Sequence, residues 1–246
     1  MVGRIEFLGL PAAGKTTILR SLVPIADQQG LRLLVPLPPA ASNDLERWQK
    51  IVRDTKSVIR LPCIAPIRAK DIWRACRYFE QPTIQAHLRM YLNCLRLEGL
   101  VDKYRGIAKF NDVIAFDQGL FQAIWSLTLC TDGGDPALYE RGMARITEVM
   151  TKPDLVILVD TSAAEIHRRL QLEPAGHGRL PGLIKCDPRW LERAAVRLES
   201  IWNHCRREPG VKTFRLSAES FDAHMLVDLI RHSCQTTRID SVSERI

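Results

Sequence analysis

The sequence reads Gly9-Leu10-Pro11-Ala12-Ala13-Gly14-Lys15-Thr16 a few residues after its start. This stretch matches G-x-x-x-x-G-K-S/T, a pattern typical of loops that wrap around phosphate groups. Glycines let the main chain approach a phosphate with its N–H groups pointing inward, and the helix that follows adds its positive N-terminal end. Lys15 is expected to reach the terminal phosphates of a nucleoside triphosphate, and Thr16 to hold Mg²⁺. The residues predicted to bind the phosphates are Gly9, Ala12, Ala13, Gly14, Lys15, Thr16 and Thr17.

The sequence around this loop predicts an α/β fold. A strand over Arg4–Leu8 precedes the loop, and a helix starts near Lys15 with Ile18, Leu19 and Leu22 on one face. Near-continuous apolar runs alternate with helical patterns along the rest of the chain, which is typical of a parallel sheet covered on both faces. The further strands are expected at Leu31–Leu37, Val113–Phe116, Leu155–Val159 and Thr213–Leu216. We therefore expect a three-layer fold with a five-stranded parallel sheet flanked by helices.

The segments between these strands predict one domain over residues 1–246 with two additions. A helical insertion spans about residues 40–110, and its best helix is Thr83–Tyr104, with Leu88, Leu92, Leu95 and Leu100 at near-helical intervals. Glycines and prolines between residues 172 and 186 indicate a loop, so we expect a lid loop over about residues 168–186. Asp187-Pro188 then predicts the start of a helix that runs to about Arg207.

Composition narrows the class of protein. The chain has 246 residues, of which 46% are hydrophobic and 26% charged, values that are ordinary for a globular protein. No apolar run is long enough to cross a bilayer and no secretory signal is evident, so a cytoplasmic protein that does not enter membranes is expected. Seven scattered cysteines without a Cys-x-x-Cys pair indicate neither a zinc site nor a disulfide framework.

A net charge of +7 favours anionic partners such as nucleotides, phosphorylated metabolites or nucleic acid. A GC-rich genome, which encodes arginine by default, explains the same charge equally well. The basic residues do not form a stripe interleaved with aromatic residues, so nucleic acid is not the favoured partner.

Two short strings resemble the motifs of regulatory GTPases but stand in the wrong places. Thr151-Lys152-Pro153-Asp154 precedes its strand instead of following one, and Asp27-Gln28-Gln29-Gly30 lies at the end of the first helix. We interpret both as coincidences, and ATP is therefore the favoured nucleotide.

The early phosphate loop, the strand that ends at Asp117 and the segment Pro153–Asp160 together resemble thymidylate kinase and its nucleoside monophosphate kinase relatives. The resemblance implies an ATP- and Mg²⁺-dependent phosphotransferase that acts on a small-molecule acceptor, and it suggests a homodimer.

The resemblance also assigns roles to individual residues. Asp117 would orient the acceptor hydroxyl or a Mg²⁺-bound water, although it could simply end a strand. Asp160 would lie near the metal or cap the helix that begins near Ser162. Arg168, Arg169 and Arg179 would act as lid arginines on the transferred phosphoryl group. By position alone, Arg96 would bind the acceptor, and Ser217 and Ala218 would pack on the adenine.

The sequence departs from the resemblance at one informative point. The Asp-Arg pair of these kinases reads Asp117-Gln118-Gly119 here, and a neutral Gln118 at the substrate does not grip an acceptor phosphate as arginine does. The variable positions of the phosphate loop are also all apolar. A phosphate-free acceptor, such as a nucleoside or a sugar, is therefore open beside a nucleotide. Two rival interpretations remain: an ATPase or nucleotide switch that acts on a protein partner, and a kinase for nucleic-acid ends.

Overall fold

The computed structural model describes residues 2–36, 65–79, 83–129, 136–172 and 189–243. The predicted lid loop lies outside these residues from 173 onward, as do Arg179, Asp187 and Pro188. Part of the predicted insertion, residues 40–64 and 80–82, also lies outside them.

The centre of the molecule is a five-stranded parallel sheet, as predicted. Its strands are β1 (Gly3–Leu8), β2 (Leu33–Leu34), β3 (Val113–Phe116), β4 (Leu155–Asp160) and β5 (Lys212–Ser217). Their order in the sheet is β2-β3-β1-β4-β5, so β1 lies in the middle between β3 and β4. Strand β2 is shorter than the predicted Leu31–Leu37, because only its two leucines pair with β3 at the edge of the sheet.

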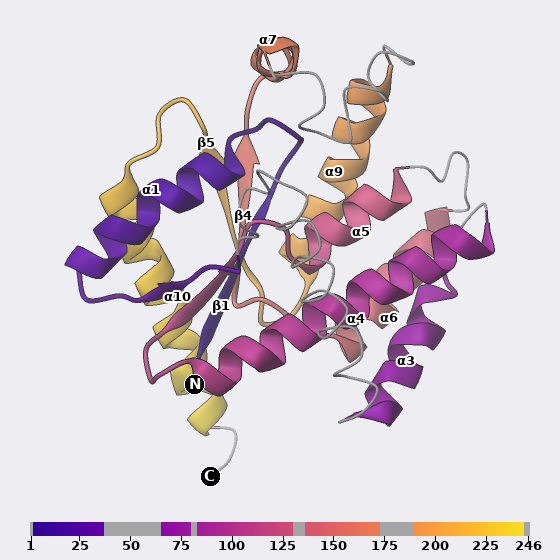
Figure 1. Cartoon of the computed structure of the whole chain (residues 1–246), viewed down its shortest axis with the longest axis horizontal. Coiled ribbons are helices and arrows are strands. Elements are labelled where there is room, and N and C mark those ends of the chain that lie inside the picture. Colours follow the sequence, from indigo (N-terminus) through magenta and orange to yellow (C-terminus); the bar gives the residue numbers. More distant parts are fainter. Residues whose placement is uncertain (1, 37–64, 80–82, 130–135, 173–188, 244–246) are drawn as a thin grey trace, which may run out of the picture.

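Helices cover both faces of the sheet. They are α1 (Lys15–Gln28), α3 (Pro66–Cys76), α4 (Ile84–Ile107), α5 (Leu120–Thr128), α6 (Pro136–Val149), α7 (Ala163–Leu172), α9 (Trp190–Arg207) and α10 (Ala223–Ser243). Helices α1 and α10 lie on one face, and α4, α5 and α9 lie on the other, with α3 and α6 outside them (Figure 1). The carboxyl ends of the strands point to the top of Figure 1, where α7 also lies. This edge carries the loop between β1 and α1.

The alternation of side chains along β1 divides the interior into two cores. Ile5 and Phe7 pack towards α1 and α10, whereas Leu8 packs towards α4, α5 and α9. Arg4 and Glu6 share the second face with Leu8, and both are buried. Two charged residues therefore lie inside a strand of the central sheet.

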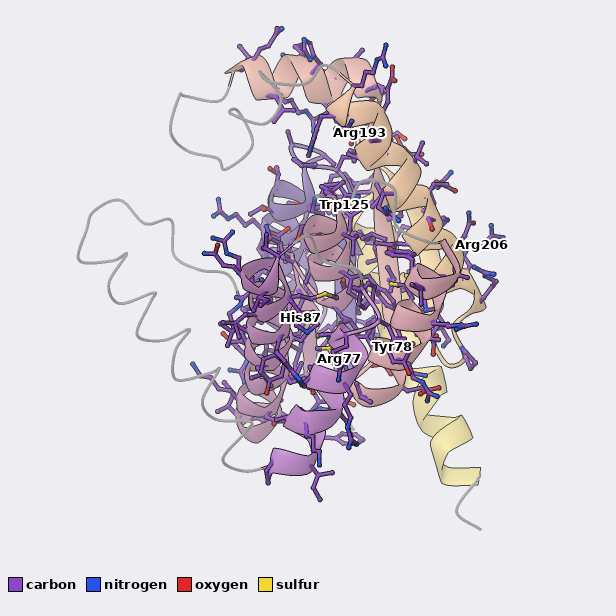
Figure 2. All side chains as sticks on the ribbon, turned by 90° about the vertical axis from the view of Figure 1, so that its right-hand side faces the viewer. Arg77, Tyr78, His87, Trp125, Arg193 and Arg206 are labelled. Atoms are coloured by element: carbon purple, nitrogen blue, oxygen red, sulfur yellow. The ribbon has the colours of Figure 1, made fainter. Side chains whose placement is uncertain are left out.

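The larger core also contains aromatic residues that lie far apart in the sequence. Trp125 of α5 is 2% exposed and donates from Nε1 to the carbonyl of Ala194, while its ring meets Trp190 edge-on. Figure 2 shows Trp125 among packed side chains and Arg206 at the outer margin of α9. None of the described helices is both long and apolar enough to cross a membrane.

Candidate active site

The loop between β1 and α1 has the curled conformation that a phosphate cradle needs. Gly14 has φ +98°, which a glycine adopts readily, and Ala12 has φ +59°, which is uncommon for any other residue. Gly9 leaves no room for a side chain, because a Cβ there would lie 2.9 Å from the carbonyl oxygen of Val159 on β4. The two positive φ angles curl the loop, and Gly9 lets its first residue pass close to β4.

Side chains bind two carbonyl groups of the loop. The Thr161 hydroxyl donates to the carbonyl of Ala13 at 2.9 Å, and Arg169 Nη1 donates to the carbonyl of Ala12 at 3.1 Å. Helix α1 has no side-chain cap, and its first main-chain bond runs from Ile18 N to Gly14 O. The N–H groups of the first turn therefore have no intrahelical acceptor, and such a helix N-terminus favours an anion.

Lys15 is folded back onto this loop. Its Nζ donates to the carbonyls of Gly9 at 2.7 Å and Leu10 at 2.8 Å, and the residue is 8% exposed. Burial lowers the pKa of Lys15 to about 8, although the nearby Asp117 carboxylate opposes this shift. The ammonium group is thus held by neutral acceptors, which a polyphosphate can replace.

Asp117 lies directly after β3 and meets Thr16 at the start of α1. The Thr16 hydroxyl donates to Asp117 Oδ2 at 2.6 Å, so two residues that are about a hundred positions apart in the sequence form one site. The second oxygen, Asp117 Oδ1, is buried and has no hydrogen-bond partner among the described residues. A hydroxyl and a carboxylate beside a phosphate cradle are oxygen donors of the kind that Mg²⁺ accepts. Among the described residues, no group of three or more His, Cys, Asp or Glu side chains could hold a metal by itself.

Two of the predicted lid arginines lie within helix α7 and not in a loop. Arg169 reaches the phosphate loop, where its Nη1 would lie 3.2 Å from a Cβ placed on Gly14. Glu165, one turn earlier, accepts from Arg169 Nε at 2.6 Å and from Arg168 Nε at 2.7 Å. Hydrogen bonds from Arg168 and Arg169 lower the pKa of Glu165 to about 2. Arg169 is therefore the arginine that the structure brings to the loop, whereas Arg168 is exposed beside it.

The remaining predicted site residues do not join this cluster through any hydrogen bond or ion pair in the described part of the chain. Asp160 is exposed on β4 and lies 4.0 Å from Arg215, and the cap of α7 is Ser162, whose hydroxyl accepts from Glu165 N. Other residues are placed by the fold alone: Gln118 is exposed after Asp117, Arg96 is half-buried on α4, Ser217 ends β5 and Ala218 follows it. Thr17 is exposed in the first turn of α1.

Sequence reasoning missed three residues that hold the loop in place. Gln122 Oε1 accepts from Gly9 N at 3.0 Å, and the N–H of Gln122 donates to Glu6 at 2.9 Å. Thr161 binds Ala13 from the start of the β4–α7 connection. Only Glu6 carries a signal in the sequence, since a charged residue inside a strand that is buried on both faces needs a polar partner.

Comparison with solved structures identifies the fold. Over 95% of this chain and 99% of the other, the protein is similar to a deoxyadenosine kinase from M. mycoides with products dCMP and dCDP bound, at 15% identity and a TM-score of 0.52. A second structure of that enzyme, with bound dATP, matches with 15% identity and a TM-score of 0.51, covering 93% of this chain and 97% of the other. A thymidylate kinase from Candida albicans matches 99% of this chain and 92% of its own with 13% identity and a TM-score of 0.45. No protein-family model and no curated protein matches the sequence. The chain thus has a P-loop fold like that of the deoxyadenosine kinase.

Proposed function

We propose that the protein transfers the γ-phosphoryl group of ATP, with Mg²⁺, to a hydroxyl group of a small molecule. The observation that carries this proposal is the joint site of Thr16 and Asp117 at the mouth of the phosphate loop. A regulatory cradle needs only to hold a nucleotide, but here a buried oxygen of Asp117 has no hydrogen-bond partner among the described residues and belongs to the carboxylate that meets the start of α1. The P-loop kinase fold supports the same activity.

The residues of the site would act mainly by position and charge. The N–H groups at the start of α1 and the ammonium of Lys15 would bind the β- and γ-phosphates, after Lys15 leaves the carbonyls of Gly9 and Leu10. Thr16 and Asp117 would hold Mg²⁺, which supplies charge neutralisation between the phosphates when it is bound. Asp117 Oδ1 would accept a hydrogen bond from the acceptor hydroxyl or from a metal-bound water. The oxygen of the acceptor would then form the new bond to the γ-phosphorus as the bond from that phosphorus to the ADP oxygen breaks, and the hydroxyl proton would pass to Asp117 or to water.

Arg169 is the arginine best placed to stabilise the transferred group. It already donates to the carbonyl of Ala12 and stands beside Gly14, while Glu165 fixes its guanidinium. Charge that develops on the equatorial oxygens during transfer would meet this guanidinium within the loop. Arg179 stays a prediction, because it lies outside the described residues.

The acceptor is proposed to be free of phosphate. Gln118 follows Asp117 and is exposed at the carboxyl edge of the sheet, and a neutral amide does not balance the charge of a monophosphate. A nucleoside is the first candidate, since the structures with the higher similarity belong to a deoxyadenosine kinase. Arg96 remains the candidate for the acceptor side of the site.

A panel of acceptors tests the proposal. ATP turnover with Mg²⁺ is measured with nucleosides, nucleoside monophosphates, sugars and 5′-hydroxyl oligonucleotides, and products are identified by mass spectrometry. We expect a product heavier by one phosphoryl group with a nucleoside or a sugar. Slow hydrolysis that no acceptor changes would instead show an ATPase or a switch. Phosphorylation of oligonucleotides, with affinity that falls steeply with salt, would show a kinase for nucleic-acid ends.

A further inference from the structure

Gln122 is a buried amide that joins helix α5 to the first residue of the phosphate loop. The residue is 5% exposed, and its Oε1 accepts from the N–H of Gly9 at 3.0 Å. Gly9 also lies close to β4, where a Cβ added to it would be 2.9 Å from the carbonyl oxygen of Val159. Without the amide oxygen of Gln122, the Gly9 N–H would be a buried donor with no acceptor.

Glu6 holds the main chain of Gln122 in place. Glu6 is fully buried on β1, and its Oε1 accepts from the N–H of Gln122 at 2.9 Å, in the first turn of α5. The carboxyl group lies so close to Gly119 that a Cβ there would be 2.4 Å from Oε2. The charged and titratable groups that act on Glu6 are Arg4 on its own strand and Cys205 on α9. Oε1 can accept from Gln122 whether or not the carboxyl group carries a proton.

These contacts connect the two halves of the candidate site. Asp117, Gln118 and Gly119 link β3 to α5, and Gln122 lies in the first turn of that helix. The bond from Gly9 to Gln122 therefore ties the phosphate loop to the start of α5, and it adds to the pairing of β1 with β3 and to the bond from Thr16 to Asp117.

We propose that Gln122, held by Glu6, is a positioning residue that aligns the phosphate loop with Asp117 for nucleotide binding and transfer. This inference rests on the proposed function, because it assumes that the loop binds a nucleotide. It adds two residues that touch neither the nucleotide nor the acceptor.

Calorimetric titration with ATP and Mg²⁺ in the absence of an acceptor tests this role. Gln122→Met keeps the length of the side chain and removes the acceptor, so we expect the Kd for ATP to rise about tenfold. The matched control is Thr128→Val, which removes a buried hydroxyl bonded to the carbonyl of Ile124 at the far end of the same helix. This control should lose similar thermal stability and keep the Kd of the wild type.

A second variant protects the test against misfolding. Gln122→Asn is shorter by one methylene, so its oxygen no longer reaches Gly9 although the side chain remains polar, and the same rise in Kd is expected. In the turnover assay both variants should lower kcat as well as raise KM, since Asp117 shifts with α5. Equal Kd values for the wild type, the folded Gln122 variants and Thr128→Val would overturn the positioning role alone. Absence of ATP binding by the wild type would overturn the proposed function instead.

Discussion

The two ends of the parallel sheet each hold a carboxylate, Glu98 at the amino end and Asp117 at the carboxyl end, and the two are satisfied in different ways. At the amino end, the carboxylate of Glu98 is fully buried and lies 2.5 Å from Arg68 Nη2. It also accepts from the main-chain N–H of Thr151 at 2.6 Å and from the Thr151 hydroxyl at 3.0 Å. Both oxygens of this carboxylate are occupied, and charge faces opposite charge.

At the carboxyl end, the charges are left ready for a ligand. Lys15 rests on two neutral carbonyls, and Asp117 keeps one oxygen without a partner among the described residues. Desolvated charges cost stability even where, as for Lys15 and Asp117, an opposite charge lies nearby, so a fold retains them where they serve another purpose. Burial of charge alone therefore does not indicate a binding site. A site is indicated by buried charged groups whose hydrogen-bond partners a ligand can replace.

The largest expected effect is on activity at the carboxyl end. Lys15→Met should lower kcat/KM for ATP by about a thousandfold, because it removes the ammonium that we propose binds the transferred phosphate. The effect on the unfolding free energy in urea should be smaller, since the lost bonds to two carbonyls and the lost attraction to Asp117 are offset by the removal of a buried charge. Lys70→Met, at an exposed position of α3, is the control and should leave turnover unchanged. A Lys15→Met enzyme that retains turnover would contradict the role of Lys15.

The next effect is on stability at the amino end. Glu98→Gln removes the charge that Arg68 and Thr151 share, so the unfolding free energy should fall by about 4 kcal/mol. The matched control is Arg145→Ala, which breaks the exposed pair with Glu148 and should leave the unfolding free energy close to that of the wild type. If Glu98→Gln and Arg145→Ala lowered the unfolding free energy equally, the buried cluster around Glu98 would not stabilise the fold more than an exposed ion pair does.

Glu6 lies between the two ends and should make stability depend on pH. Burial raises the pKa of Glu6 from 4.5 to about 7, although Arg4 and N–H groups at the start of α5 oppose the shift. The folded chain therefore keeps a proton that the unfolded chain releases near pH 4.5, and stability should fall as the pH rises through this window. The fall corresponds to about 3 kcal/mol. Urea unfolding at pH 5 and pH 8 should show this loss of unfolding free energy in the wild type and not in Glu6→Gln. An equal change in unfolding free energy between the two pH values in both proteins would refute the role of Glu6.

The smallest effect concerns strain in the phosphate loop. Ala12 has φ +59°, so Ala12→Gly should raise the unfolding free energy by about 1 kcal/mol. Ala13 is buried without a positive φ, and Ala13→Gly should lower it by about the same amount. Calorimetric melting of the two variants checks the difference in sign. A stability loss in both would mean that the loop is not strained at Ala12.

The sequence predicts well what depends on neighbouring residues. The phosphate loop is a continuous motif, and the strands beside it are apolar runs, so their existence, order of appearance and parallel class could be predicted. The meeting of Thr16 with Asp117 follows from the rule that side chains at the carboxyl ends of adjacent parallel strands come together.

Contacts between distant polar residues could not be predicted in this way. Leu88 and Leu92 fit the helical period of α4 but are 44% and 37% exposed, while Glu98 on the same helix is fully buried. A hydropathy pattern predicts that such a carboxylate lies on the surface, because the pattern carries no information on where Arg68 lies in space. Gln122 was missed for the same reason: its role depends on where Glu6 and Gly9 meet it in space.

The resting position of Lys15 sets a threshold for what the loop accepts. A small monoanion that enters the empty loop must compete with two carbonyl oxygens that already satisfy the ammonium, and it offers little more than they do. A triphosphate presents several oxygens and a much larger charge at once, so it repays that exchange and still gains the main-chain N–H groups. The loop should accordingly ignore the inorganic phosphate that is abundant in cells and open only to chains of phosphates.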